Sequence, residues 1–158
     1  WQRGRLSPEN LAFLASWPWQ REVEGALLVH GSPCDPWEYL DDLAPARQAF
    51  RCSEARLAFH GHTHLAGAFL ELQGPRPWVR YQAFPEGGEL VLPPSVRALV
   101  NPGSVGQPRD GVPGAAFALW EGARIAFYRV AYDLGRVAAR LAEEGFPPWL
   151  YTRLTLGQ

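Results

Sequence analysis

Four histidines are the residues of this chain best suited to chemistry, and all of them lie between positions 30 and 64. Three fall in the stretch His60-Gly61-His62-Thr63-His64. In an extended segment alternate side chains share one face, so His62 and His64 are expected to reach the same side. Neutral imidazole is the commonest protein ligand for first-row transition metals. The spacing therefore predicts a metal site, with a loop of solvated or internally hydrogen-bonded histidines as the alternative.

The other two histidines differ in their surroundings. His30 follows an apolar run, residues 26–29, and precedes the small residues Gly31-Ser32-Pro33, which leave room around its ring. His60 is in phase with His62, but Gly61 between them favours a bend in the backbone. We therefore expect His30 to join the ligands and His60 to pack behind them, although the spacing alone also permits His60 as a ligand.

A third polar segment, residues 101–111, contains candidates for phosphate binding. Backbone N–H groups and the planar guanidinium of an arginine are suited to phosphate oxygens. The same composition is typical of an ordinary surface loop, so the interpretation requires the segment to lie beside the histidines. The candidate substrate-binding residues are Asn101, Gly103, Ser104 and Arg109.

The periodicity of apolar residues predicts the elements that position these loops. Helices are expected at 8–16, at 36–44 with Asp35 as its cap, and at 133–144, where Gly145 ends the last helix and Pro147-Pro148 prevent its resumption. Buried strands are expected at 23–29 and 55–59, which deliver His30 and His60 at their ends. From residue 66 onward the pattern changes to strands joined by short turns, which predicts a second, largely antiparallel sheet. Its strands are expected at 66–72, 78–84, 89–92, 96–100, 114–120 and 123–130, with a turn at Glu121-Gly122 between the last two.

Composition restricts the class of protein. A chain of 158 residues suits one domain, and a net charge of -1 gives no basic surface for nucleic acid. Cys34 and Cys52 are too few for a disulfide framework, so free thiols in a reducing, cytoplasmic setting are expected. The sequence has no apolar run long enough to span a membrane. It also contains no methionine, so we expect a processed chain or a fragment.

Three segments in this order resemble the calcineurin-like metallophosphoesterase superfamily, and most closely its small bacterial and archaeal phosphodiesterase branch. They are Leu28-Val29-His30-Gly31-Ser32-Pro33, Gly61-His62-Thr63-His64 and Asn101-Pro102-Gly103-Ser104-Val105-Gly106. The resemblance runs from about Ala26 to the end of the chain. It implies an α/β fold, an α/β/β/α sandwich of two mixed sheets flanked by helices, of which residues 1–158 form the C-terminal part with the N-terminal portion absent.

The resemblance also implies an activity and a ligand set. In that family two divalent metal ions, such as Mn, Fe, Zn or Ni, share one site, and a metal-bridging hydroxide attacks phosphorus. His30 and His62 would then bind one ion and His64 the other. The family's earlier motifs, Asp-x-His, Gly-Asp and Gly-Asn-His-Asp, do not occur in this sequence. The expected function is that of a phosphodiesterase acting on a small phosphoester, with the isolated fragment inactive until the missing N-terminal segment completes it.

Two other interpretations stay open at this point. The chain could keep the fold as a non-catalytic scaffold or binding module, or it could bind a single zinc ion through His60, His62 and His64. The sequence does not identify the substrate, the metal or the oligomeric state.

Overall fold

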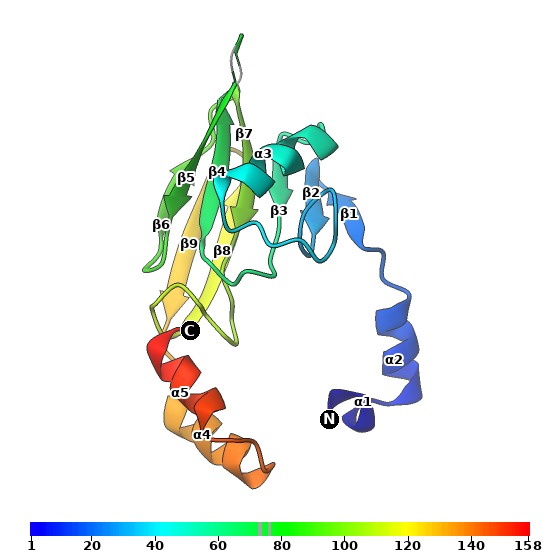
Figure 1. The fold of residues 1–158 in the computed structure, drawn as a ribbon, viewed down its shortest axis with the longest axis vertical. Coiled ribbons are helices and arrows are strands. Elements are labelled where there is room, and N and C mark those ends of the chain that lie inside the picture. The colour runs from blue at the N-terminus through cyan, green and yellow to red at the C-terminus, as the bar shows by residue number, and fades with distance from the viewer. Residues whose placement is uncertain (73, 76) are drawn as a thin grey trace.

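The computed structural model describes residues 1–72, 74–75 and 77–158 and shows two stacked β-sheets with helices around them (Figure 1). The larger sheet has six strands in the order β1-β2-β3-β7-β4-β5, and the smaller has three in the order β6-β9-β8. The expected α/β architecture of two sheets flanked by helices is confirmed. The strands are β1 Gln20–Val23, β2 Ala26–Val29, β3 Leu57–Phe59, β4 Gly67–Leu72, β5 Trp78–Ala83, β6 Gly88–Val91, β7 Val96–Asn101, β8 Ala115–Glu121 and β9 Arg124–Val130. The helices are α1 Gln2–Arg5, α2 Pro8–Ala15, α3 Leu43–Cys52, α4 Leu134–Glu143 and α5 Trp149–Leu156.

The centre of the larger sheet is a set of parallel strands. β2 pairs in parallel with β3, and β3 pairs in parallel with β7. β1 forms an antiparallel hairpin with β2, and β4 and β5 add antiparallel strands beside β7. The prediction that all strands from residue 66 form a second sheet is therefore wrong for β4, β5 and β7. Alternating residues reveal that a strand has two faces, but they do not reveal which neighbour it pairs with.

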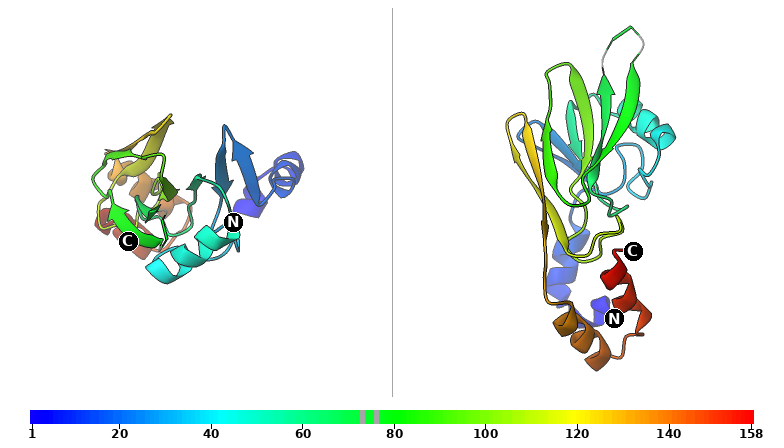
Figure 2. Two further views of the ribbon diagram at one scale, coloured as in Figure 1. Left: turned by 90° about the horizontal axis from the view of Figure 1, so that it is seen from above. Right: turned by 90° about the vertical axis from the view of Figure 1, so that its left-hand side faces the viewer.

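Two apolar cores lie on opposite faces of the larger sheet. On β7, Ala98 and Val100 point into the core between the sheets, whereas Leu99 points into the core under α3. β4 repeats the pattern, with Ala68 and Leu70 on one side and Phe69 on the other, as period-two alternation requires. Figure 2 shows the resulting layers, with the smaller sheet, the larger sheet and α3 in that order. The central strands β3 and β7 are covered on both faces, whereas Leu28 on β2 stays 39% exposed.

The helix predicted at 36–44 is wrong. The Asp35 side chain accepts a hydrogen bond from the backbone N–H of Trp37, which closes a local turn in place of a helical cap. The helix α3 begins later, at Leu43, with Asp42 as its cap, and it includes Pro45 in the first turn, where proline is tolerated.

The other helices agree better with prediction. α2 begins at Pro8 after the Ser7 cap, and α4 follows the Asp133 cap. Pro147-Pro148 do not prevent a further helix, because Pro148 is itself the N-cap of α5. The last hairpin turns at Gly122-Ala123, one residue later than expected, since Glu121 pairs with Arg124. No helix among the described residues is long and apolar enough to cross a membrane.

Cys34 and Cys52 form a disulfide, so the prediction of free thiols is wrong. Their sulfur atoms are 2.07 Å apart and their Cα atoms 5.4 Å apart. The spacing of 18 residues gives no sign of this contact, which arises because α3 ends at Cys52 beside the loop that follows β2. The cytoplasmic location rested partly on free thiols and stays a prediction.

The disulfide should stabilise the loop after β2 against unfolding. Closing a loop of this length contributes about 3 kcal/mol to the free energy of unfolding. We expect the double variant Cys34→Ser, Cys52→Ser of the complete protein to show a melting temperature lower by roughly 5–10 °C in calorimetry. A reductant should lower the melting temperature of the unchanged protein and leave that of the double variant unaffected. Equal responses to the reductant would contradict this assignment.

Candidate metal centre

Three polar loops meet at one edge of the larger sheet because β2, β3 and β7 are parallel neighbours. The carboxyl ends of parallel strands lie at the same edge, which is where sites form in such sheets. His30 follows β2, His60 follows β3, and Asn101 ends β7. Backbone hydrogen bonds continue the pairing beyond the strands, from Gly61 N–H to the His30 carbonyl and from His60 N–H to the Val100 carbonyl, both 2.9 Å. The sequence prediction that these loops come together is confirmed.

His30 and His62 form a close imidazole pair. The His30 Nε2 atom lies 3.0 Å from the His62 Nδ1 atom. Two ring nitrogens this close share a hydrogen bond when one carries a proton, and both can face one ion when neither does. Burial, and then the charge of His62, lower the pKa of His30, which favours the neutral ring that a metal requires. This pair fits the ligand set of one transition-metal ion.

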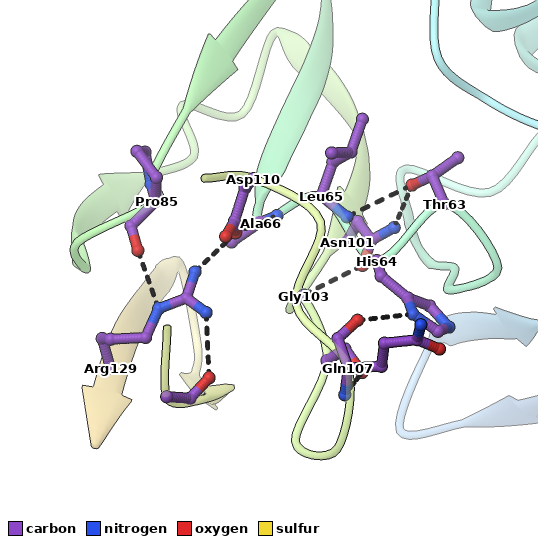
Figure 3. Close-up of polar contacts among 12 residues, drawn as sticks. Thr63, His64, Leu65, Ala66, Pro85, Asn101, Gly103, Gln107, Asp110 and Arg129 are labelled. Atoms are coloured by element: carbon purple, nitrogen blue, oxygen red, sulfur yellow. Dashed lines mark hydrogen bonds and ion pairs between the residues drawn. The ribbon is translucent and has the colours of Figure 1, made fainter. Parts of the chain in front are cut away.

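His64 is held in one orientation by the third loop (Figure 3). Its Nδ1 atom lies 2.7 Å from the Gln107 carbonyl oxygen, and its own carbonyl accepts a hydrogen bond from Arg109 N–H at 3.2 Å. Since a carbonyl only accepts, Nδ1 carries the proton and Nε2 keeps its lone pair. Metal-binding histidines are commonly oriented by such a bond on the other ring nitrogen. The condition set for segment 101–111, that it lie beside the histidines, is met.

The protonation of His64 reflects these neighbours. Burial lowers its pKa most, the hydrogen bond to the Gln107 carbonyl opposes that effect, and the charges of Arg109, His62 and His30 lower it further. The Arg109 guanidinium therefore acts on the His64 ring, and its Nε atom is buried without a hydrogen-bond partner among the described residues. The third loop therefore places a fixed positive charge beside the His64 ring.

The segment between Gly61 and His64 is not extended, contrary to the sequence prediction. His62 and His64 both have left-handed backbone angles, with φ of 63° and 61°. Glycine was expected to supply the bend, yet Gly61 has no positive φ, and a Cβ atom there would lie 3.7 Å from the His30 carbonyl oxygen, an ordinary contact. Positive φ is uncommon outside glycine and collects at functional sites. The left-handed backbone angles of His62 and His64 therefore set the directions of their own side chains.

The predicted substrate residues differ in what they contact. Asn101 is 2% exposed, and its Nδ2 atom donates to the Gly61 carbonyl at 2.9 Å and to Thr63 Oγ1 at 2.8 Å. Its Oδ1 atom accepts from Gly103 N–H at 2.9 Å, so that N–H is also engaged. Ser104 Oγ accepts from Gln107 N–H at 2.9 Å. These three residues hold the loops in this arrangement, which leaves Arg109 as the candidate for phosphate contact.

His60 lies beneath the loop and not at its surface. It is 4% exposed, and neither ring nitrogen has a hydrogen-bond partner among the described residues. Burial lowers its pKa to about 4, although the polar Gly61 backbone nearby acts in the opposite direction. The structure therefore separates His60 from the facing pair of His30 and His62.

The sequence reasoning missed two aromatic residues at this site. The Tyr39 ring centroid lies 4.0 Å from that of His62, and the Trp37 ring lies 5.9 Å from that of His30. Both had been assigned to a helix, so no pattern in the sequence pointed to them. The described residues include no group of three or more His, Cys, Asp or Glu side chains arranged to hold one ion.

Comparison with known proteins places these features in a family. The model of the calcineurin-like phosphoesterase superfamily domain matches residues 12–122. An uncharacterized protein of Methanocaldococcus jannaschii is 31% identical over 177 aligned positions, which include the whole of this chain and 64% of that protein. The crystal structure of a metallophosphoesterase from Sphaerobacter thermophilus superposes with a TM-score of 0.87 and 34% identity, over 98% of this chain and 65% of the other. The chain thus spans about two thirds of the length of these relatives.

The buried ring of His60 should make stability depend on pH. Its folded pKa of about 4 lies below the ordinary value of 6.5, so the unfolded chain binds the proton more readily between these values. The free energy of unfolding should therefore fall as the pH drops from 6.5 to 4, by at most about 3 kcal/mol from this residue. Denaturant unfolding of the complete protein and of His60→Leu at both pH values measures this. The variant should show the smaller loss, and an equal loss in both proteins would contradict the prediction.

Proposed function

The chain belongs to the calcineurin-like phosphoesterase superfamily, and from this premise we propose that it is part of a metal-dependent phosphoesterase, specifically a phosphodiesterase with two metal ions. The observation that carries the proposal is the facing pair of His30 and His62, with the oriented ring of His64 nearby. A scaffold has no chemical need for three such imidazoles. The alternative of a non-catalytic module therefore has less support.

Members of this family typically use divalent metals, and the residues present suit them. We assign His30 and His62 to one ion and His64 to a second, with Mn, Fe, Zn and Ni all compatible with imidazole ligands. Divalent ions at such a site supply a nucleophile active near neutral pH and offset charge on the phosphoryl oxygens. The lowered pKa values of His30 and His64 favour neutral rings at neutral pH, in which one nitrogen of each keeps a free lone pair.

Arg109 is assigned to the substrate. Its guanidinium lies close enough to His64 to lower the pKa of that ring, and its Nε atom has no protein partner among the described residues. A guanidinium beside a metal site suits a phosphate oxygen, which it binds in a planar fork. The substrate proposed is a small phosphoester, and the cytoplasm is its proposed location.

The remaining ligands are proposed to come from the rest of the domain. The relatives are longer than this chain, and the family's Asp-x-His, Gly-Asp and Gly-Asn-His-Asp motifs have no counterpart within residues 1–158. We propose that an N-terminal segment supplies these carboxylates and completes the shell. The mononuclear zinc alternative has little support, because His60 is buried away from the facing histidine pair.

The complete protein should hydrolyse a generic diester such as bis-p-nitrophenyl phosphate when supplied with manganese or another transition metal. His62→Ala and His64→Ala should each lower kcat by at least about 100-fold and reduce bound metal, because each removes a proposed ligand. His60→Ala should change kcat only mildly at temperatures where it is folded. Kinetics together with metal analysis provide the measurement, and comparable losses in all three variants would reject this choice of ligands.

Arg109→Ala should weaken substrate binding without loss of metal. Removing one charge-assisted contact should raise KM about 10-fold while the metal content stays unchanged. Arg109→Lys is the matched control, since it keeps the charge but not the fork, and an intermediate KM is expected. Unchanged kinetics in both variants would show that segment 101–111 has only a structural role.

Residues 1–158 purified alone should turn over no phosphodiester in saturating manganese. Three imidazoles without a carboxylate should bind at most one ion, and only weakly, because a second dication would remain uncompensated. Calorimetric titration with manganese gives the stoichiometry. Robust turnover that a chelator abolishes would show that this chain needs no further ligands.

A further inference from the structure

Two aromatic side chains are displayed beside the candidate metal histidines. Trp37 is 72% exposed and Tyr39 is 46% exposed. The Trp37 ring centroid lies 5.9 Å from that of His30 and 6.3 Å from that of His62, in edge-on geometry. Tyr39 lies against the other side chain of the pair, 4.0 Å from the His62 ring centroid. Large aromatic surface left in water next to polar ligands is typical of a binding site.

The loop that carries these rings is held by its own hydrogen bonds. Ser32 is fully buried, and its Oγ atom accepts from Cys34 N–H and Asp35 N–H, each at 3.1 Å, and donates to Glu38. The Asp35 carboxylate in turn fixes the backbone of Trp37, at 2.8 Å from its nitrogen. The exposed rings are thus presented on a braced backbone. Pre-organisation of this kind lowers the entropy cost of binding a ligand.

Close packing and the disulfide add to this bracing. A Cβ atom at Gly31 would lie 2.6 Å from the Pro36 carbonyl oxygen and 2.8 Å from that of Glu38, so the loop folds back tightly on the end of β2. The Cys34–Cys52 disulfide ties the same loop to α3. The loop geometry therefore depends on the scaffold and not on the aromatic residues themselves, so these can be replaced without unfolding it.

A groove leads from His30 along the Trp37 ring. It has a volume of about 790 Å³, which is within the usual range for small-molecule sites. Its walls include three tryptophans and the metal-site residue His30, so the groove is continuous with the candidate centre. The lining includes Trp17, Trp19, Trp37, Leu28, Val29 and His30.

We propose that Trp37 and Tyr39 form a stacking platform for the nucleobase of the substrate, which is a nucleotide-type phosphodiester. This inference rests on the proposed phosphoesterase function and names its substrate class. Three features support it: exposed aromatic rings, their position beside the candidate metal imidazoles, and a groove along Trp37 large enough for a nucleoside. Bases stack on aromatic side chains whatever their sequence, and Trp37 offers the more exposed surface for this.

The test compares two diesters with the same leaving group on the complete protein. These are thymidine 5′-(p-nitrophenyl phosphate), which carries a base, and methyl p-nitrophenyl phosphate, which does not. Trp37→Ala should lower kcat/KM for the thymidine ester about 10-fold and change that for the methyl ester by less than about twofold. Trp37→Phe keeps a ring and should retain most of the activity. Trp78→Ala, which removes a tryptophan 52% exposed on β5, is the matched control and should leave both substrates unaffected.

Other outcomes would overturn the proposal. An equal loss on both esters would show that Trp37 positions the histidines and does not bind the base. Unchanged kinetics in Trp37→Ala would show that another occupant, such as a further part of the complete protein, fills the groove.

Equilibrium dialysis with thymidine 5′-monophosphate separates this inference from the proposed function. Suppose that the protein hydrolyses neither ester with any metal, but that Trp37→Ala, unlike Trp78→Ala, raises the Kd for thymidine 5′-monophosphate about 10-fold. The stacking platform is then supported and the phosphoesterase assignment is rejected. A Kd that is the same in all variants overturns the platform.

Discussion

The buried amide of Asn101 is the interaction on which the candidate site depends. From the end of β7 it donates to the Gly61 carbonyl and to Thr63 Oγ1, and it accepts from Gly103 N–H. One side chain therefore fixes both the histidine loop and the start of the third loop. The left-handed angles at His62 and His64 cost about 1–3 kcal/mol each, and they persist only where the surroundings over-determine them. Buried, fully satisfied hydrogen bonds provide that constraint, since breaking one would leave a polar group without a partner.

A buried ion pair with surrounding hydrogen bonds positions the third loop, residues 101–111, against the smaller sheet (Figure 3). Arg129 on β9 pairs with Asp110, at 2.5 Å, with side chains only 8% and 7% exposed. The guanidinium also donates to the carbonyls of Pro85 and Gly114, and the Asp110 carboxylate accepts from Ala66 N–H. A buried ion pair contributes little net stability because both charges lose their hydration. Its value here is geometric, because with these bonds it joins β9, the third loop, Pro85 and Ala66, and thereby fixes where Arg109 meets His64.

Local signals in the sequence were enough to find the site, but not to describe it. The apolar runs before His30 and His60 and the caps at Ser7 and Asp133 are short-range features, and the structure has a strand or helix at each. The single strand expected at 23–29 is wrong, because a turn at Glu24-Gly25 divides it into β1 and β2. The disulfide, the partition of strands between the sheets and the late start of α3 depend on contacts between distant segments, which periodicity does not record. The extended histidine segment failed for another reason. Alternation of side chains assumes regular φ angles, and His62 and His64 have left-handed angles instead. The hydrogen bonds that hold this backbone come from Asn101, 40 residues beyond Gly61, so no local pattern predicts them.

Under the proposed function, the charges of the site explain why imidazoles alone would not complete it. Burial and mutual repulsion lower the pKa of His30 and His64, so metal binding need not displace protons from these rings at neutral pH. The same Arg109 charge that suits a phosphate opposes any cation placed beside His64. Neutral ligands and a guanidinium leave the charge of a divalent ion uncompensated, and two such ions would repel each other strongly at short range. Under the proposed function, the rest of the domain therefore has to supply carboxylates that face His30, His62 and His64. This chain would supply the imidazole ligands, and Arg109 would supply the contact with the phosphate of the substrate.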